Sequence, residues 1–183
     1  MAKHALLVMD VQRVVVDRYP DPAYLPRLRA AIDGARSGGV PVIYVVVGFR
    51  PGYPEISTRN KIFGRLPGMM ALAGSDEATQ VHPDVAPEPG DVLVTKRRVS
   101  AFAGSDLDMV LRAGDIDHLV LTGIATSGVV LSTLRQSADL DFGLTVLADA
   151  CLDADPEVHR VLTEKVFPHQ ADVTTVADWA ATR

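Results

Sequence analysis

The 183-residue sequence predicts an α/β fold, because short apolar runs typical of buried strands alternate with helical patterns along the chain. Alternating strands and helices form a parallel sheet with right-handed crossovers. The expected product is a three-layer α/β/α sandwich, Rossmann-like, around a parallel sheet of about six strands. No internal repeat or linker divides the sequence, so we expect residues 1–183 to form one domain.

A strand, a glycine-containing turn and a helix follow one another in residues 118–142, at the centre of the predicted fold. The apolar run at 119–121 is the strand, Gly123 lies in the turn, and a helical pattern starts at about Thr126. The first backbone N–H groups of a helix lack intrahelical partners, and the helix dipole adds positive potential there. The turn therefore favours an anion or an oxyanion. Ligands of open α/β sheets bind beyond the carboxyl ends of the strands, so we expect the site here.

The first half of the chain contains three further predicted strands, each a short apolar run. They cover residues 4–9, 40–47 and 91–95. Between the first two, residues 22–37 carry apolar side chains at helical spacing, and Gly38 and Gly39 end this helix. Residues 48–90 are rich in proline and glycine, which predicts a long excursion with a short helix near 67–73. Long loops of this kind often carry binding or lid functions.

The second half alternates in the same way. Predicted helices cover 105–112, 126–142 and a segment that begins at Pro156, and predicted strands cover 144–147 and 173–176. Asp155 and Pro156 form an N-cap and first-turn pair for the last helix. Four apolar residues of this helix are expected to face inward: Val158, Val161, Leu162 and Val166.

The amino-acid composition and net charge argue against several classes of protein and of binding partner. The net charge is −5, and no basic cluster is denser than residues 96–98, which argues against nucleic acid or an anionic membrane as a partner. No apolar run approaches the roughly 18 residues that a membrane span needs, and the amino terminus lacks the pattern of a signal peptide. A single cysteine excludes an internal disulfide. We expect a cytoplasmic protein whose partner is a small-molecule substrate.

Three predicted strands end in groups that could carry chemistry. Asp10 follows the first strand, Lys96 follows the strand at 91–95, and the turn 123–129 follows the central strand. In a parallel sheet these ends meet at one edge, so the three groups are expected to converge. Taken singly, such an aspartate is more often a turn or cap residue, and such a lysine is more often solvated. Their joint placement favours a functional site.

The sequence also contains a series of short motifs whose order and spacing can be compared with those of known families. They are LVMDVQ (7–12), HP (82–83), PGD (89–91) leading into Lys96, SAF (100–102), DLD (106–108), TGIAT (122–126), ST (132–133) and ADAC (148–151). In this order and spacing the chain resembles the isochorismatase-like (cysteine hydrolase) superfamily over nearly its whole length. The resemblance implies an α/β sandwich and an Asp, Lys and Cys triad, whose aspartate matches Asp10 and whose lysine matches Lys96. It also implies a cis peptide in the turn matching Ile124 and Ala125, where backbone N–H groups form an oxyanion hole.

Five residues are candidates for binding the substrate. They are Gln12, Phe49, Arg50, Arg98 and Phe102. Arg50 or Arg98 would suit a dicarboxylate through bidentate contacts, and the sequence does not choose between them.

The sequence departs from the family at the nucleophile. The family's cysteine stands three residues after the threonine that matches Thr126, and here that position is Val129. Valine offers no lone pair, proton or charge, so a thioester route is not expected. Cys151 follows a different predicted strand and is interpreted as a buried structural residue.

No cofactor and no catalytic metal are expected. The five histidines show no metal-ligand spacing. Zinc-binding members of the superfamily carry an Asp-x-His element after the second strand, and this sequence has Val47-Gly48-Phe49-Arg50 there.

Three hypotheses for function follow. The first is a cysteine-less hydrolase that acts on a small carboxylated or amide substrate, with Asp10 as general acid/base. Isochorismatases of the superfamily also lack the cysteine and hydrolyse an enol ether in this way, although they carry glycine where this chain has Val129. The second hypothesis is a catalytically inactive member that binds a small metabolite or serves as an assembly partner. The third, a nucleotide-binding domain, lacks a G-x-G-x-x-G motif after the first strand and any Walker pattern.

The resemblance also implies a homo-oligomer, a dimer or a tetramer. The predicted helix 126–142 carries apolar residues that would suit a partner subunit: Val129, Val130, Leu134, Leu140 and Phe142. The alternative is that this face packs only on its own sheet.

Overall fold

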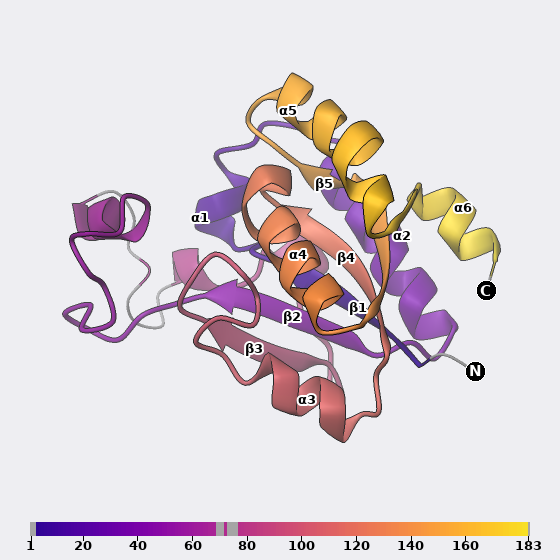
Figure 1. The fold of residues 1–183 in the computed structure, drawn as a ribbon, viewed down its shortest axis with the longest axis horizontal. Helices are drawn as coiled ribbons and strands as arrows, with labels where there is room; N and C mark the ends of the chain where they lie inside the picture. The colour runs from indigo at the N-terminus through magenta and orange to yellow at the C-terminus, as the bar shows by residue number, and fades with distance from the viewer. Residues whose placement is uncertain (1–2, 69–71, 73–76, 183) are drawn as a thin grey trace.

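One parallel sheet organises the computed structural model, which describes residues 3–68, 72 and 77–182 (Figure 1). Within these residues the sheet has six strands in the order β3-β2-β1-β4-β5-β6, and every neighbouring pair is parallel. The strands are β1 His4–Met9, β2 Val42–Val47, β3 Val92–Lys96, β4 His118–Ile124, β5 Gly143–Leu152 and β6 Asp172–Thr174. The predicted α/β fold with a six-stranded parallel sheet is confirmed.

The winding of the sheet reverses between β1 and β4. From β1 the chain adds β2 and β3 on one side, and it then returns to place β4, β5 and β6 on the other side. The connections after β1 and β4 therefore leave the sheet in different directions and open a crevice at its carboxyl edge. This topological switch point is where a ligand site is expected in an open α/β sheet.

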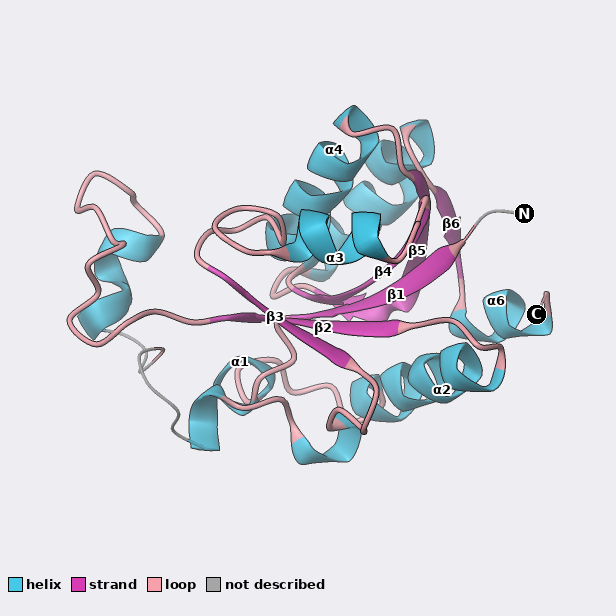
Figure 2. Cartoon of the chain, turned by 90° about the horizontal axis from the view of Figure 1, so that it is seen from below, coloured by secondary structure: helices cyan, strands magenta, loops and turns pink. Residues whose placement is uncertain are grey.

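Helices cover both faces of the sheet (Figure 2). One face is covered by α3 Leu107–Ala113 and α4 Leu131–Asp139, together with the chain after α5 Pro156–Val161. The other face is covered by α2 Tyr24–Ser37 and α6 Val176–Ala181, while the short helix α1 Arg13–Val16 lies near the carboxyl end of β1. The structure thus has the three layers that the alternation of elements predicts.

The central strands are buried on both faces, which explains their uninterrupted apolar sequence. In β1, Leu7 and Met9 pack into the cluster beneath α3 and α4, and Leu6 and Val8 pack into the cluster beneath α2. All four side chains are at most 1% exposed. Successive strand residues point to opposite faces, so a strand between two helical layers has no solvent-facing side on which to place polar residues.

Several element boundaries differ from the sequence-based expectation. The helix after β4 begins with a π-helical turn, Thr126–Val130, and its α-helical part ends at Asp139 rather than 142. Strand β5 reaches Leu152 instead of ending at 147, and its register against β4 shifts between Leu121 and Gly123. The short helices α1 and α6 were not predicted, because runs of four and six residues show little helical periodicity.

The expected inward face of the helix after Pro156 was partly wrong. Leu162 is buried and Val166 packs partly buried against the core, but Val158 and Val161 are 37% and 36% exposed. The prediction assumed 3.6 residues per turn throughout, whereas the α-helix ends at Val161 and a π-helical turn follows. The wider turn changes which residues face the sheet.

The excursion after β2 projects from the sheet (Figure 1). The short helix predicted near 67–73 is a 3₁₀ helix at Phe63–Gly68, and residues 69–71 and 73 lie outside the described residues. A separate apolar cluster joins the excursion to the end of β2; its buried members are Val47, Phe49, Phe63, Leu66 and Leu72.

The apolar face of the helix after β4 is largely used by its own sheet. Val129, Val130 and Leu134 are at most 2% exposed, and Phe142 packs partly buried on the same cluster, whereas Leu140 is 41% exposed. The expected homo-oligomer stays a prediction. Within the described part of the chain, no helix has the length and apolar character needed to cross a membrane.

Gly123 allows β4 to pass close to β1, and substituting it tests whether the two strands approach as closely as the structure shows. Its φ is +137°, and a Cβ atom there would lie 2.2 Å from the carbonyl oxygen of Met9. Gly123→Ala should lower the free energy of unfolding by at least about 2 kcal/mol, because strain and overpacking add together. Urea denaturation measures the change.

Gly34→Ala is the matched control. In α2 a Cβ atom at Gly34 would meet Trp179 at an ordinary 3.7 Å, so this variant should be neutral or more stable by up to about 1 kcal/mol. Equal stability of the Gly123→Ala variant and the wild type would contradict the close approach of β1 and β4.

Candidate active site

A buried ion pair lies at the carboxyl edge of the sheet, beside the switch point. Asp10 directly follows β1, and Lys96 is the last residue of β3, two strands away. The Lys96 Nζ atom lies 2.9 Å from Asp10 Oδ2, and the side chains are 2% and 12% exposed. The backbone N–H of Asp10 donates to the carbonyl oxygen of Val45 in β2 at 2.8 Å, which fixes the residue at the strand end. The predicted convergence of these two groups is what the structure shows.

The two oxygens of the Asp10 carboxyl group differ in their surroundings. Oδ2 faces the Lys96 ammonium, which also donates to the carbonyl oxygen of Arg98 at 2.9 Å. Oδ1 is buried and has no hydrogen-bond partner among the described residues. Burial raises the pKa of Asp10 above its ordinary value of 3.8, and this effect exceeds the opposing influence of the Lys96 charge and hydrogen bond. The site therefore holds a carboxyl group that protonates more readily than a solvated aspartate.

A cavity of about 260 Å³ opens beside this pair. The described residues that line it come from the ends of β1, β2, β3 and β4 and the chain that follows β3 and β4, from the excursion, and from α1 and the chain after it. They are Asp10, Val15, Arg18, Tyr19, Val47, Ile62, Phe63, Leu66, Leu72, Lys96, Val99, Ile124, Ala125, Gly128 and Val129. A mostly apolar hollow with a few polar groups is typical of a small-molecule site.

The turn after β4 forms one wall of the cavity. The peptide bond between Ile124 and Ala125 is cis, and both residues line the hollow. The backbone N–H groups of Gly128 and Val130 donate to the carbonyl oxygen of Ala125 at 3.0 and 3.3 Å. These two N–H groups are thus already used, and an oxyanion at this wall would have to accept hydrogen bonds from other backbone N–H groups of the turn.

Two side chains hold this turn from outside the cavity. The Thr126 hydroxyl oxygen lies 2.8 Å from Nδ1 of His159, which belongs to α5. The backbone N–H of Ser127 donates to Asp153 Oδ2 at 2.7 Å. Thr126 is fully buried and does not line the cavity. It is the first residue of the π-helical turn rather than its cap, and its hydroxyl contacts His159 instead of a backbone N–H of the turn.

Val129 occupies the position at which the resemblance places the nucleophile. It is 2% exposed, lines the cavity and packs into the core cluster beneath α4. Cys151 lies apart from the described cavity lining, and its Sγ is 3.9 Å from the carbonyl oxygen of Leu121. Burial raises the pKa of this thiol to about 12, so at neutral pH it is a protonated core residue.

The predicted substrate-binding residues lie outside the cavity lining. Gln12 is 1% exposed, and its amide group bonds the backbone N–H and carbonyl of Val47 at 2.9 and 3.0 Å and the carbonyl of Thr79 at 2.7 Å. Phe49 is buried in the cluster of the excursion, with its ring centroid 5.7 Å from that of Phe63. Both residues support the wall of the cavity from behind.

The two candidate arginines and Phe102 are also engaged elsewhere. Arg50 pairs with Glu55 at 2.5 Å, and Arg98 donates to the carbonyl oxygens of Arg97 and Glu55, each at 2.7 Å. Phe102 packs against the core cluster, with its ring centroid 6.2 Å from that of Phe142. A role for these residues in binding substrate stays a prediction.

Sequence reasoning missed Arg18 and Tyr19, which line the cavity. They follow α1, whose four residues give no periodic signal. Their position did carry a signal, because the connection after the first strand runs along the edge where ligands bind. A charged and an aromatic residue in that connection are therefore natural site candidates.

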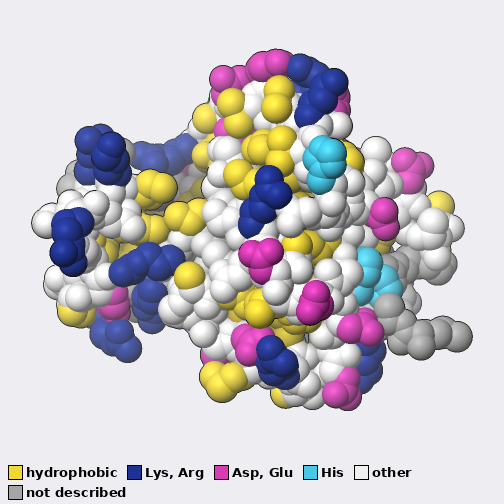
Figure 3. All heavy atoms as spheres, viewed as in Figure 1, with side chains coloured by type: hydrophobic (Ala, Val, Ile, Leu, Met, Phe, Trp, Pro, Cys, Tyr) yellow, Lys and Arg dark blue, Asp and Glu magenta, His cyan; other side chains and the backbone are white. Residues whose placement is uncertain are grey.

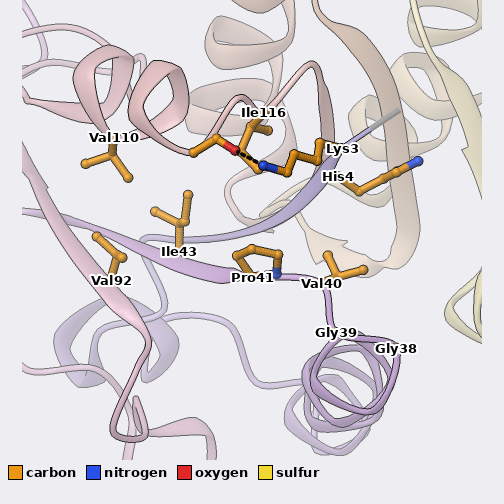
Figure 4. A pocket seen from close by; sticks show the side chains of 11 residues that line it. Lys3, His4, Gly38, Gly39, Val40, Pro41, Ile43, Val92, Val110 and Ile116 are labelled. Atoms are coloured by element: carbon orange, nitrogen blue, oxygen red, sulfur yellow. Dashed lines mark hydrogen bonds between the residues drawn. The ribbon is translucent and has the colours of Figure 1, made fainter. Parts of the chain in front are cut away.

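A larger hollow lies at the opposite end of the strands (Figure 4). Its volume is about 450 Å³, and apolar residues such as Val40, Ile43 and Ile116 line it. The Lys3 ammonium at its rim donates to the carbonyl oxygen of Gly114 at 3.0 Å. No acidic residue is among its described lining residues, so volume alone does not identify the reactive site. The described residues also contain no cluster of three potential metal ligands.

The fold and the site place the chain among α/β proteins that have an acid–lysine pair beside a cavity at the switch point of the sheet. Residues 4–178 match the family described as the isochorismatase domain, and the chain belongs to this family. Relatives at 30% identity or more are named as an amidohydrolase and an amidase, which are hydrolases.

Curated relatives and solved structures agree with this assignment. The chain is 37% identical to the ureidoacrylate amidohydrolase RutB of Stutzerimonas stutzeri over 84% of this chain and 71% of the relative. It is 32% identical to RutB of Yersinia enterocolitica over 97% and 89% of the two chains. The structure resembles N-carbamoylsarcosine amidase from Thermoplasma acidophilum, with a TM-score of 0.77, 30% identity and coverage of 95% and 96%.

The surroundings of Asp10 predict how its pKa changes when Lys96 is replaced. Lys96→Met removes a charge and a hydrogen bond that both lower the pKa of Asp10, so this pKa should rise further. In the wild type the folded pKa already exceeds the ordinary 3.8, so the stability that Asp10 contributes is present at low pH and is lost as the pH rises through the folded pKa. Carbon-13 NMR titration of labelled aspartate measures both values.

Lys165→Met, at an exposed site away from the cavity lining, is the control and should leave the Asp10 titration unchanged. An Asp10 pKa below 3.8 in the wild type, or a downward shift in Lys96→Met, would contradict the dominance of burial.

Proposed function

We propose that this chain is a hydrolase of small amide or carboxylated substrates that uses Asp10 as general acid/base and has no cysteine nucleophile. The observation that carries the proposal is the Asp10–Lys96 pair on the wall of a cavity of about 260 Å³, with Asp10 Oδ1 buried and without a hydrogen-bond partner among the described residues. A buried, unsatisfied carboxylate oxygen is costly in a structural residue. The same oxygen is well placed to exchange a proton with a bound water or substrate.

The absence of a thiol at the cavity supports direct attack by water. The sequence contains one cysteine, Cys151, and it is buried away from the described lining. Val129 stands where the family resemblance places the nucleophile, and its side chain cannot form a covalent intermediate. Hydrolysis at this site would then proceed without an acyl-enzyme.

For an amide substrate, the ionised form of Asp10 would act first as a base. It would take a proton from water as the water oxygen bonds to the carbonyl carbon, and amide groups of the turn after Ile124 would stabilise the oxyanion. Asp10 would then return the proton to the leaving nitrogen as the C–N bond breaks. Lys96 would stabilise the ionised carboxylate and developing negative charge. The names of the relatives, ureidoacrylate amidohydrolase and N-carbamoylsarcosine amidase, favour this substrate class.

For an enol ether, the protonated form of Asp10 would act as an acid. It would donate its proton to the vinyl carbon, and water would capture the oxocarbenium ion and release a ketone and an alcohol. The raised pKa of Asp10 favours this role, because more of the carboxyl group is protonated at a given pH. The pH profile separates the two roles: kcat/KM falls as pH rises through the Asp10 pKa for an acid, and rises for a base.

The second candidate function is small-molecule binding without turnover, or a role as an assembly partner. Val129 favours it, because this apolar side chain narrows the cavity at the position where a nucleophile would act. Partners other than a small molecule, including a second copy of the chain, are part of this alternative.

The first test is turnover. Ammonia release from a panel of small amides, including ureidoacrylate and N-carbamoylsarcosine, is measured beside pyruvate release from isochorismate. Wild type should be active on a member of this set, and Asp10→Asn should lose activity by about 100-fold or more because it cannot exchange the proton. Asp33→Asn, at an exposed position in α2, should remain active.

Val129→Cys distinguishes the two candidate functions. An inactive wild type combined with amide hydrolysis in Val129→Cys would contradict the cysteine-free hydrolase and show a scaffold whose nucleophile is missing. Val158→Cys places the same thiol at an exposed site outside the cavity lining and should show no such gain. No measurable turnover by either the wild type or Val129→Cys would favour the binding role.

A further inference from the structure

We propose that the hydroxyl group of Tyr19 donates a hydrogen bond to the carbonyl oxygen of an amide bound in the cavity, and that it stabilises the negative charge which develops on this oxygen. The inference deepens the proposed function, since it rests on the amide hydrolase of that proposal and adds a catalytic residue to the same cavity. Tyr19 follows α1 and lies outside the short motifs of the sequence.

The turn after β4 has already committed several of its own donors. The backbone N–H of Ser127 donates to Asp153 Oδ2 at 2.7 Å. The N–H groups of Gly128 and Val130 donate to the carbonyl oxygen of Ala125, at 3.0 and 3.3 Å. Each of these groups would have to leave its partner before it could bind an oxyanion. A donor from another wall of the cavity would therefore add directly to the stabilisation of charge.

Tyr19 carries the only uncharged polar side chain among the described residues that line the cavity. The charged side chains there are those of Asp10, Arg18 and Lys96. The Lys96 ammonium already has two acceptors, Asp10 Oδ2 and the carbonyl oxygen of Arg98, each at 2.9 Å. Within the part of the chain that the structure describes, the Tyr19 hydroxyl makes no hydrogen bond. A ligand can use this donor without breaking an existing contact.

The backbone and the ring hold Tyr19 in place at this wall. Its N–H donates to the carbonyl oxygen of Val16 at 2.8 Å, and its carbonyl oxygen accepts from the N–H of Asp21 at 2.8 Å. The half-buried ring also packs against the apolar cluster beneath α2. The residue is thus positioned before a ligand arrives, which is what makes an oxyanion donor effective.

The charges around the Tyr19 hydroxyl place it near both parts of the site. Burial raises the pKa of Tyr19 above its ordinary value of 10.0, the carboxylate of Asp153 raises it further, and that of Asp10 adds a smaller effect. The positive charge of Arg18 opposes these effects without outweighing them. Such influences weaken with distance, so the hydroxyl lies toward Asp10 and toward Asp153, which holds the turn through Ser127. Because its pKa is raised, the phenol keeps its proton at neutral pH and remains a donor.

The apolar character of the cavity increases the value of such a donor. Most of the described lining residues carry hydrocarbon side chains, among them Phe63, Leu66 and Val129. In these surroundings a hydrogen bond to a charged oxygen is stronger than the same bond in water. The bond from a neutral hydroxyl to an oxyanion is also stronger than its bond to the neutral carbonyl, so it favours the transition state over the bound substrate.

The excursion adds a positive field around the same cavity. It carries exposed Arg59, Lys61 and Arg65 beside the residues that it supplies to the lining. Lys and Arg side chains gather over this part of the molecule in Figure 3, although the whole chain has a net charge of −5. Such a field favours negative charge in the cavity, but it does not select one atom. A positioned hydroxyl group directs the stabilisation to the carbonyl oxygen.

An infrared binding experiment tests the proposal without requiring turnover. The probe is benzamide labelled with carbon-13 at its carbonyl group, a small amide whose ring suits the apolar wall. A hydrogen bond to a carbonyl oxygen lowers the frequency of the C=O stretch, so difference spectra of the saturated complexes detect the donor. Ligand-observed NMR titration gives the Kd of benzamide for each protein.

Wild type is compared with Tyr19→Phe and with a matched control, Tyr24→Phe. The Tyr24 hydroxyl of α2 is buried, has no hydrogen-bond partner among the described residues and lies outside the described cavity lining. Both variants therefore lose the same group, but only one loses it from the cavity wall.

Tyr19→Phe should raise the carbonyl stretching frequency of bound benzamide and weaken its Kd by about 3- to 10-fold, the loss expected for one neutral hydrogen bond. Tyr24→Phe should match wild type in both measurements. For an amide that wild type hydrolyses, Tyr19→Phe should lower kcat by about 100-fold.

The proposal would be overturned by equal carbonyl frequencies in wild type and Tyr19→Phe, by an equal change in Tyr24→Phe, by an unchanged kcat in Tyr19→Phe, or by a wild type that does not bind benzamide. An absence of turnover with the Tyr19-dependent frequency shift intact would support the contact and count against the proposed hydrolase alone.

Discussion

The reversal of winding between β1 and β4 is the constraint on which the rest of the site depends. The two strands are paired along their length, yet the chain leaves β1 toward one side of the sheet and leaves β4 toward the other. The crevice between these connections receives Asp10 from one strand and the turn from Ile124 to Val129 from the other. Gly123 permits the close approach that brings the two walls together, since a side chain there would meet the backbone of Met9.

The ion pair shows how burial changes the proton equilibrium of Asp10 at this edge. Taking two charges out of water costs free energy, and their attraction often only offsets that cost. Here the attraction does not offset the whole cost of desolvation, because one oxygen of Asp10 has no partner among the described residues. Lys96, in contrast, has a second acceptor in the carbonyl oxygen of Arg98. A fold that needed only stability would do as well with two apolar residues of similar volume. An unpartnered carboxyl oxygen beside the cavity is what the proposed acid–base role of Asp10 would require.

The sequence predicted the layers, the parallel sheet and the convergence of Asp10, Lys96 and the turn before Val129, because these follow from strand ends and from the motif order. Beyond Asp10, Lys96, Ile124, Ala125 and Val129, it did not predict which side chains face the cavity. Gln12 stands in the motif at 7–12, but its side-chain amide hydrogen-bonds the backbone of Val47 at the end of β2, a contact that only the folded chain creates. Arg18 was missed because a helix as short as α1 leaves no periodic trace. Side-chain roles depend on tertiary partners, and local patterns do not contain them.

The separate apolar cluster of the excursion has a consequence for how this protein can change over evolution. Phe63, Leu66 and Leu72 shape the cavity, yet they belong to neither of the two clusters that hold the helices to the sheet. Mutations there can remodel the binding surface while the main cores keep their packing. The Asp10–Lys96 pair is carried by the strand ends of the sheet, and the shape of the cavity beside it can diverge independently. One scaffold can in this way acquire new substrates by small steps, each tolerated because global stability is governed elsewhere.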